Sequence, residues 1–349
     1  MAEQKALLLE TPKGELRVRQ IPIPKPGPGE LLVKIHATAL NPIDQKRRDT
    51  GFLIHAYPAI LGLDAAGIVE ALGEGTQGFA KGDRVAYEGH VFSNDKATFQ
   101  QYSTVPAEIA VKLPENISFD EAASIPLCIA TAAVGLYSER PEGVGKYTPC
   151  WEEGGEGLYR GKPIVIFGGS SSVGQFGKRR LIQFARLSGF SPIITTASLH
   201  NSEFLKSLGA NYVVDRKADV PAKVKEILGD TLVELVYDSV SEKDTQPQAW
   251  EVLSPGGTLV LVRRDVHVDK NKGKTVIDTI FADFHGPELR QFGASLQSKL
   301  TRLLENGTIK PNRVEVLPNG LAGISDGLDR IKENKVSGIK LVSRPFETV

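Results

Sequence analysis

Cysteine is scarce in this sequence: the 349 residues include only Cys128 and Cys150. Two cysteines cannot build a disulfide framework, and neither belongs to a CxxC pair of the kind that binds zinc or shuttles electrons. The six histidines also lack the regular spacing with carboxylates that nominates the ligands of a catalytic zinc. We therefore expect a reducing compartment and no metal centre.

An excess of charge of one sign is also missing, because Lys plus Arg and Asp plus Glu both number 42. The overall charge therefore gives no electrostatic reason to expect nucleic acid or an anionic membrane as the partner. No apolar run reaches the ~20 residues that span a bilayer, and the first residues contain no cleavage-like site. The sequence predicts a cytoplasmic protein whose ligand is a small molecule.

The length exceeds what one hydrophobic core usually supports, so two domains are expected. Up to about Leu127 the chain reads as short strands between prolines and glycines, with clear alternation over 32–37. Such a pattern is typical of an antiparallel, barrel-like all-β unit. From about Ile129, apolar strands alternate with helical segments. This alternation predicts an α/β, Rossmann-type domain with a doubly wound parallel sheet.

The strands expected in this second domain are 164–167, 193–195, 212–214, 235–237 and 259–262, and the helices are 173–188, 203–208 and 220–228. A polar, glycine-rich stretch over 139–161 precedes them. It reads either as a mobile lid or as a disordered surface insert, and its composition favours the insert.

A glycine- and serine-rich turn follows the first of these strands and opens a helix. Small residues there let a diphosphate approach the unpaired N–H groups and the positive end of the helix dipole. The alternatives are a purely structural turn, a P-loop, which would need Lys in place of Gln175, and a GxSxG elbow, which would need Gly at Ser170. The P-loop and the elbow are excluded, because the sequence lacks the residues that they require. The predicted phosphate-binding residues are Gly168, Gly169, Ser170, Ser171, Ser172, Val173 and Gly174.

The end of the second strand indicates which dinucleotide is bound. An NAD-specific domain carries Asp or Glu there, whereas the stretch 195–201 has no carboxylate. Ser198 and His200 can donate hydrogen bonds to a 2′-phosphate, and Arg216, just past the third strand, supplies a cation. We therefore expect NADPH as the cofactor. The alternative for Ser198 is a plain helix N-cap.

Motifs along nearly the whole chain resemble the medium-chain dehydrogenase/reductase superfamily, in its zinc-independent quinone oxidoreductase and enoyl reductase branch. Within that branch, 167–174, 196–201 and 316–321 are similar to fungal trans-acting enoyl reductases of polyketide assembly. The stretches that carry the wider resemblance are 41–44, 61–67, 82–85, 207–210, 254–257 and 336–342.

The resemblance implies a GroES-like catalytic domain over 1–128 and 308–349 and a Rossmann domain over 129–307, with the cofactor cleft between them. It also implies that no zinc is bound. The zinc enzymes carry Gly-His-Glu where this sequence has Gly62-Leu63-Asp64, and a cysteine where it has Asn41. Cys128 lies close to the third ligand position, but without partners it is expected to be a packing residue.

The resemblance further assigns site residues. It places Asn41, Asp44 and Lys46 on the substrate side and Thr131 beside the nicotinamide, and it includes Lys340 among the cofactor-binding residues. Hydride addition to a β-carbon makes an enolate, which needs a stabilising charge and a proton. Lys46 is the candidate for the charge, the alternative being a solvated surface lysine. Water or Tyr57 is the candidate proton source.

The sequence thus predicts an NADPH-dependent, zinc-independent reductase of carbon–carbon double bonds in enones or enoyl thioesters. A quinone reductase with the same cofactor stays open, as does a catalytically silent NADPH-binding partner of a larger synthase. An acyl carrier or a polyketide synthase is the candidate protein partner. The chain departs from the family at Arg216, where a Tyr is usual, and in a longer helix through 177–180.

Overall fold

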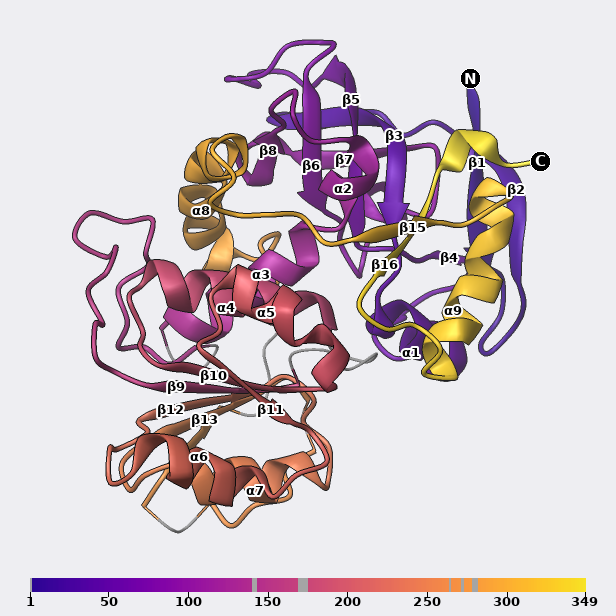
Figure 1. Ribbon diagram of the computed structural model, residues 1–349. Coiled ribbons are helices and arrows are strands. Elements are labelled where there is room, and N and C mark those ends of the chain that lie inside the picture. Colours follow the sequence, from indigo (N-terminus) through magenta and orange to yellow (C-terminus); the bar gives the residue numbers. More distant parts are fainter. Residues whose placement is uncertain (1, 140–142, 169–174, 264, 271–272, 278–281) are drawn as a thin grey trace. The chain divides into compact units, whose positions relative to one another are not determined.

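The computed structural model describes residues 2–139, 143–168, 175–263, 265–270, 273–277 and 282–349, without the side chains of 175–179 (Figure 1). The chain divides into two compact units. The first unit comprises Met1–Leu127 and Asp283–Val349, and the second unit comprises Cys128–Ala282.

The second unit is built on a six-stranded sheet in the order β11-β10-β9-β12-β13-β14, with every pair of neighbours parallel. All four residues of β9 are buried, as expected for a strand covered on both faces. The order reverses between β9 and β12, which creates a topological switch point. The strands are β9 (Ile164–Phe167), β10 (Ile193–Ala197), β11 (Tyr212–Asp215), β12 (Leu235–Asp238), β13 (Thr258–Leu261) and β14 (Thr275–Ile277).

Helices cover both faces of this sheet. In Figure 1, α4 and α5 lie on one face, and α6 and α7 lie on the other. Asp219 begins α6 by accepting a hydrogen bond from the Ala222 backbone, and α5 ends at Gly209, where φ is 124°. The predicted doubly wound fold is confirmed. The helices are α3 (Pro126–Tyr137), α4 (Gln175–Leu187), η3 (Leu199–Asn201), α5 (Ser202–Leu208), α6 (Val220–Leu228) and α7 (Thr245–Val252).

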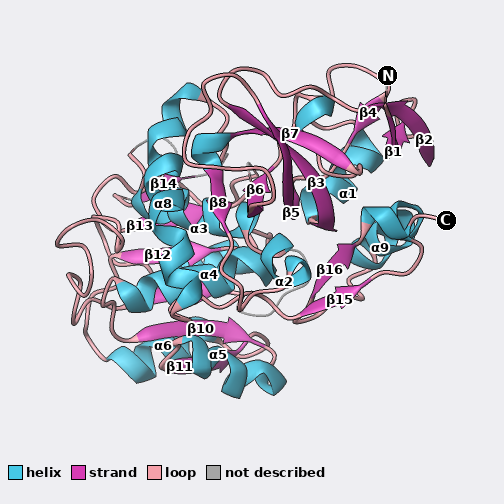
Figure 2. Cartoon of the chain, turned by 90° about the horizontal axis from the view of Figure 1, so that it is seen from above, coloured by secondary structure: helices cyan, strands magenta, loops and turns pink. Residues whose placement is uncertain are grey.

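The first unit contains a larger sheet in the order β15-β16-β3-β5-β6-β8, with β7 also paired to β3, and a smaller sheet in the order β2-β1-β4. All pairs are antiparallel except β15 with β16, which lie side by side in Figure 2. Gly67 is required in β5, because a Cβ there would collide with the Lys34 carbonyl oxygen. The strands are β1 (Glu3–Leu9), β2 (Leu16–Pro22), β3 (Glu30–Ala39), β4 (Ala59–Ile60), β5 (Asp64–Leu72), β6 (Arg84–Glu88), β7 (Tyr102–Pro106), β8 (Ala110–Lys112), β15 (Val314–Val316) and β16 (Lys340–Ser343).

One hydrophobic core of the first unit joins the two ends of the chain, because Leu7, Leu61 and Phe99 pack with Leu321 and Leu341. This confirms the predicted sheet-rich, GroES-like unit. Its helices are α1 (Pro42–Thr50), η1 (Asn94–Lys96), η2 (Ala107–Ile109), α2 (Phe119–Ala123), α8 (Pro287–Glu305), η4 (Gly320–Gly323), α9 (Ile324–Lys332) and η5 (Pro345–Glu347).

The return to the first unit differs from the expected boundary near residue 308, because α8 already belongs to it. Thr301 Oγ1 donates to the Lys112 carbonyl at 2.8 Å, and Arg290 pairs with Glu108 at 2.9 Å. These contacts bind α8 to β8 and η2. The family resemblance predicts that the C-terminal segment returns to the first unit. In the structure this segment begins at Asp283 and includes α8.

The predicted disordered insert is wrong for its described residues, 143–161. Trp151 packs edge-on against Tyr137 with ring centres 5.1 Å apart, and Tyr147 and Tyr159 pack on Phe190. The Tyr159 backbone N–H also donates to the Ser188 carbonyl at 2.8 Å. Aromatic anchors therefore hold this segment against the second unit.

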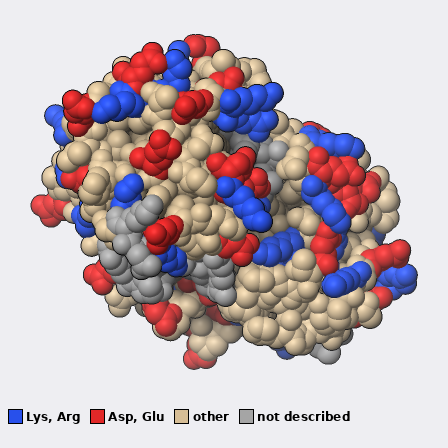
Figure 3. Space-filling model, turned by 90° about the horizontal axis from the view of Figure 1, so that it is seen from below, with Lys and Arg blue, Asp and Glu red and all other residues tan. Residues whose placement is uncertain are grey.

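Charges of both signs are interspersed on the face shown in Figure 3. Among the described residues, one helical stretch, Phe119–Tyr137, is long and apolar enough to cross a membrane, and 72% of it is buried. A core helix of a folded domain has the same properties.

Candidate functional site

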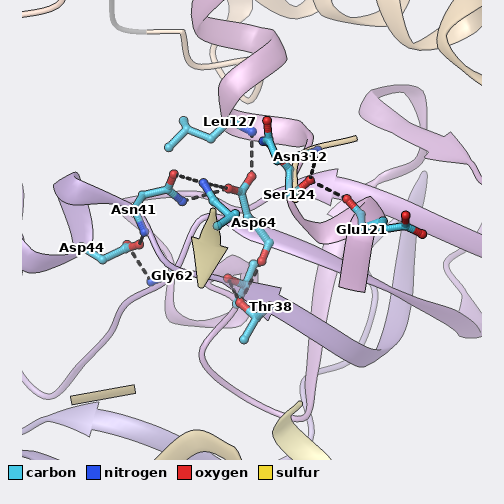
Figure 4. A network of polar contacts seen from close by, with 11 residues as sticks. Thr38, Asn41, Asp44, Gly62, Asp64, Glu121, Ser124, Leu127 and Asn312 are labelled. Carbon is cyan, nitrogen blue, oxygen red and sulfur yellow. Dashed lines mark hydrogen bonds and ion pairs between the residues drawn. The ribbon is translucent and has the colours of Figure 1, made fainter. Parts of the chain in front are cut away.

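A buried polar network surrounds Asp64 in the first unit (Figure 4). Its carboxylate accepts hydrogen bonds from Asn41 Nδ2 at 2.9 Å and from the Leu127 backbone at 2.7 Å. Lys340 Nζ lies 3.0 Å from Asp64 Oδ2, and both side chains are 0% exposed. Lys340 also donates to Asn41 Oδ1 at 2.5 Å. Donors thus saturate a charge that would otherwise be expensive to bury.

Three distant segments supply this network. Asn41 is the N-cap of α1 with extended backbone, and Pro42 follows at the first helical position, where a missing N–H costs nothing. Asp64 begins β5, and Lys340 begins β16. The Asn41 backbone N–H donates to Asp44 Oδ2 at 2.8 Å, which ties the start of α1 to the same network.

Asp44 is fully buried beneath this network. The Gly62 backbone donates to its Oδ1 at 3.2 Å. Burial raises the pKa of Asp44 to about 6, although Arg47, one turn further along α1, opposes the shift. Arg47 donates to the Val91 carbonyl at 2.7 Å. Among the described residues, its Nε and Nη1 atoms have no hydrogen-bond partner.

The predicted catalytic residues lie in different surroundings. Asn41 is 3% exposed, and its amide is engaged by Asp64 and Lys340. Lys46, on the exposed side of α1, places its ammonium 4.3 Å from the ring centre of Phe52, and Tyr57 is half-buried in the loop beyond. Thr131 belongs to α3 in the second unit, where its carbonyl accepts from the Tyr237 hydroxyl at 3.1 Å.

Lys340 was predicted to bind the cofactor. Its ammonium group is buried between Asp64 and Asn41 within the first unit, and its role toward the cofactor stays a prediction. Sequence reasoning found the residue but missed its partners, and it considered Asp64 only as the replacement of a zinc-enzyme glutamate. The missed signal was a pair of opposite charges in two otherwise uncharged motifs, Asp64 within 61–67 and Lys340 within 336–342.

The predicted phosphate-binding turn begins at Gly168, directly after β9. Its φ is 89°, and its backbone N–H donates to Thr196 Oγ1 at 2.7 Å. Gly is suited to this positive φ because it carries no Cβ. The predicted residues Gly169, Ser170, Ser171, Ser172, Val173 and Gly174 lie outside the described residues.

Two of the predicted 2′-phosphate ligands follow neighbouring strands. Ser198 comes directly after β10 and Arg216 directly after β11, and the Arg216 backbone donates to the Ala197 carbonyl at 3.0 Å. Both therefore stand at the carboxyl edge of the sheet, where open α/β sheets bind ligands. His200 is exposed, and its Nε2 lies 3.0 Å from Asn201 Nδ2.

The positions that resemble the zinc site carry other residues. Leu63, at the place of the histidine ligand, is 2% exposed. Across the part of the chain that the structure describes, no group of three or more His, Cys, Asp or Glu could hold a metal ion. Independence from zinc stays a prediction, because only an experiment on the enzyme tests it.

Comparison with family models places both units. Residues 27–115 match the alcohol dehydrogenase GroES-like domain, and residues 180–281 match the domain described as zinc-binding dehydrogenase. Among solved structures, an alcohol dehydrogenase superfamily protein from Novosphingobium aromaticivorans superposes with a TM-score of 0.80 at 24% identity, over 97% of this chain and 99% of that one. A quinone oxidoreductase from Coxiella burnetii gives a TM-score of 0.72 at 25% identity, over 98% and 99% of the two chains.

Curated relatives match over the full length. Trans-enoyl reductase ACTTS2 of Alternaria alternata is 32% identical over 98% of this chain and 99% of its own. Trans-enoyl reductase tndF of Aspergillus flavipes is 32% identical over 97% and 98% of the two chains. Dehydrogenase orsE of Emericella nidulans is also 32% identical, over 98% and 99%. The chain therefore belongs to the medium-chain dehydrogenase/reductase superfamily, within the group of the fungal trans-enoyl reductases, and is an oxidoreductase of a family that uses a nicotinamide cofactor.

Proposed function

We propose that this enzyme reduces a carbon–carbon double bond conjugated to a carbonyl group, in an enone or an enoyl thioester, with NADPH. The observation that carries the proposal is the full-length similarity to trans-enoyl reductases, at 32% identity. The site chemistry supports it. Asn41 and Asp64 stand at positions that resemble those of zinc ligands, and their side chains bond each other and Lys340 where zinc relatives hold a Lewis acid.

NADPH is proposed over NADH because of the carboxyl edge of the second unit. Ser198 and Arg216 follow adjacent strands there, with His200 on the exposed turn between them. A hydroxyl, an imidazole and a guanidinium suit a dianionic 2′-phosphate. When bound, the nicotinamide supplies the hydride, and Thr131 is proposed to lie beside it.

The first unit is proposed to bind the acceptor. Charge moves onto the carbonyl oxygen when hydride reaches the β-carbon, and a nearby ammonium group stabilises it. Lys46 is suited to this role, because its ammonium is exposed and Phe52 packs against it. Asn41 acts as a positioning residue, since its amide is committed to Asp64 and Lys340 and holds the start of α1 in place.

Deuterated NADPH tests the proposal directly. With an enone, we expect the label at the β-carbon of the product, and a simple ketone should stay unreduced. Lys46→Ala should lower kcat more than it weakens NADPH binding, whereas Lys335→Ala, another exposed lysine, should change neither. Label on a carbinol carbon would show that the assigned reaction is wrong.

A quinone reductase is the second candidate, supported by the fold similarity to the Coxiella quinone oxidoreductase. Turnover with a quinone panel and none with enones would favour it. NADPH binding without turnover of either panel would favour a silent partner protein, for which an acyl carrier or a polyketide synthase is the proposed associate. A cytoplasmic location also stays a proposal, in line with two buried cysteines that are not joined in a disulfide.

A further inference from the structure

Two histidines and an aspartate meet in the first unit, outside the network around Asp64. His90 follows β6, and Asp283 and His285 precede α8. His90 Nε2 lies 3.6 Å from Asp283 Oδ2, an ion-pair distance when the imidazole is protonated. The rings of His90 and His285 stack with centres 4.7 Å apart. The side chain of His90 keeps 22% of its surface exposed.

The two histidines are suited to different tasks. His285 Nε2 donates to the Glu88 carbonyl at 2.9 Å, and burial lowers the pKa of His285 to about 4. His285 therefore stays neutral near pH 7, and its ring stacks against that of His90. Asp283 is ionised. Burial raises its pKa, but the interactions with His90 and the His285 backbone outweigh that effect and hold the pKa below its ordinary value.

His90 lies near α1 and the loop through Tyr57, where the acceptor is proposed to bind. Phe92 meets the His90 ring edge-on at 5.5 Å and stacks on His55 at 4.7 Å. Arg47 of α1 donates to the Val91 carbonyl between them. Residues 90–92 thus continue the surface formed by α1 and the loop through Tyr57, and Phe92 is 44% exposed on it.

His90 also reaches solvent. It lines a surface groove of about 680 Å³, together with Phe79, Lys96 and Arg290. A proton lost from the imidazole can therefore be replaced from water. Asp283 and His285 contact the His90 ring directly, and the Glu88 carbonyl and Arg290 contact His285. The His90 backbone N–H donates to the carbonyl of Lys96, whose ammonium pairs with Glu30.

We propose that His90 is the general acid that protonates the α-carbon of the enolate and that Asp283 is its positioning residue. This inference rests on the proposed function and replaces water or Tyr57 as the proton source. Hydride addition at the β-carbon shifts the π pair of the carbon–carbon double bond into a new double bond between the α-carbon and the carbonyl carbon, and the carbonyl π pair moves onto oxygen. When the enolate is protonated, the oxygen pair re-forms the carbonyl and the carbon–carbon π pair bonds the α-carbon to a proton of the imidazolium. The N–H bonding pair stays on nitrogen. Asp283 faces Nε2, which leaves Nδ1 for the substrate, and solvent then reprotonates His90.

The stereochemistry of protonation tests this role. An enone with an α-methyl group, reduced in deuterated water, should give one α-configuration with the wild type. His90→Gln should lower kcat about 100-fold or more and give a mixture of α-configurations, because the enolate is then protonated by solvent. His90→Phe keeps a ring for the stack on His285 and should behave in the same way. It covers the case in which the Gln variant does not fold.

Three controls make the outcome decisive. His36→Gln, at a histidine stacked on Phe119, should keep both rate and configuration. Tyr57→Phe should keep a single configuration. Asp283→Asn should move the alkaline limb of the kcat profile to lower pH, which a merely structural role would not do. The inference is overturned if the His90 variants keep one configuration at an undiminished rate, or if Tyr57→Phe alone produces the mixture. Absence of enone reduction by the wild type would instead refute the proposed function.

Discussion

Replacing Lys340 by Met is the most direct perturbation of the buried network. The substitution removes one charge of an ion pair that is 0% exposed, with the two charged atoms 3.0 Å apart. Breaking such a pair costs about 3–5 kcal/mol, because the remaining charge stays buried without compensation. Asp64 keeps the donors Leu127 N and Asn41 Nδ2, so we expect a loss near the lower end, about 3 kcal/mol.

A loss of this size is measurable in the first unit alone. At about 2–4 °C per kcal/mol for domains of this size, its unfolding midpoint should fall by roughly 6–12 °C. Hydrogen exchange of first-unit amides is the suitable assay, because two units need not unfold together. Lys335→Met, at an exposed lysine, is the matched control and should change the stability by less than about 0.5 kcal/mol.

The double variant with Asp64→Asn separates charge from packing. It leaves no buried charge at this pair, and the new amide can donate to the Asn41 oxygen that Lys340 releases. It should recover all but about 1 kcal/mol of the stability. The reasoning is refuted if the single variant loses less than about 1 kcal/mol, or if the double variant is no more stable than the single one.

Arg216→Ala should raise the KM for NADPH about tenfold and leave that for NADH nearly unchanged, with Lys217→Ala as the control; equal losses with both cofactors would contradict the assignment. Exhaustive chelation should leave turnover intact, and elemental analysis should find less than one zinc per chain, whereas an activity-linked zinc would refute independence from metal. Because burial raises the pKa of Asp44 from 3.8 to about 6, its stabilising effect is complete below pH 3.8 and is lost as pH rises through 6. Compared with Asp44→Asn, the wild type should therefore lose about 3 kcal/mol of unfolding free energy across this window, and parallel stability curves would contradict it.

The second unit was largely predictable because its signals are local. Apolar runs bounded by turns gave β9 within the predicted range, and α6 begins and ends where the pattern placed it, at Val220 and Leu228. Helix α1 was missed in a region read as strands, although Asn41, Pro42 and Gly51 are typical N-cap, first-turn and C-cap residues.

Contacts between distant residues could not be predicted. Lys340 and Asn41 are 299 residues apart in the chain, and no periodicity links them. The same holds for His90 and Asp283, which different segments bring together. The insert 143–161 was judged by its glycines, whereas Tyr147, Trp151 and Tyr159 determine how it packs.

Because both ends of the chain contribute to the first unit, this unit can be completed only late in translation. Strand β16 lies between β15 and β3, so the larger sheet is incomplete until residues 340–343 have been translated. The second unit is continuous from Cys128 to Ala282 and can fold as soon as it leaves the ribosome. Until residues 340–343 are translated, the first unit has unpaired strand edges, and Asp64 lacks its ion-pair partner Lys340. Nascent chains halted before residue 340 should therefore recruit chaperones through their N-terminal part.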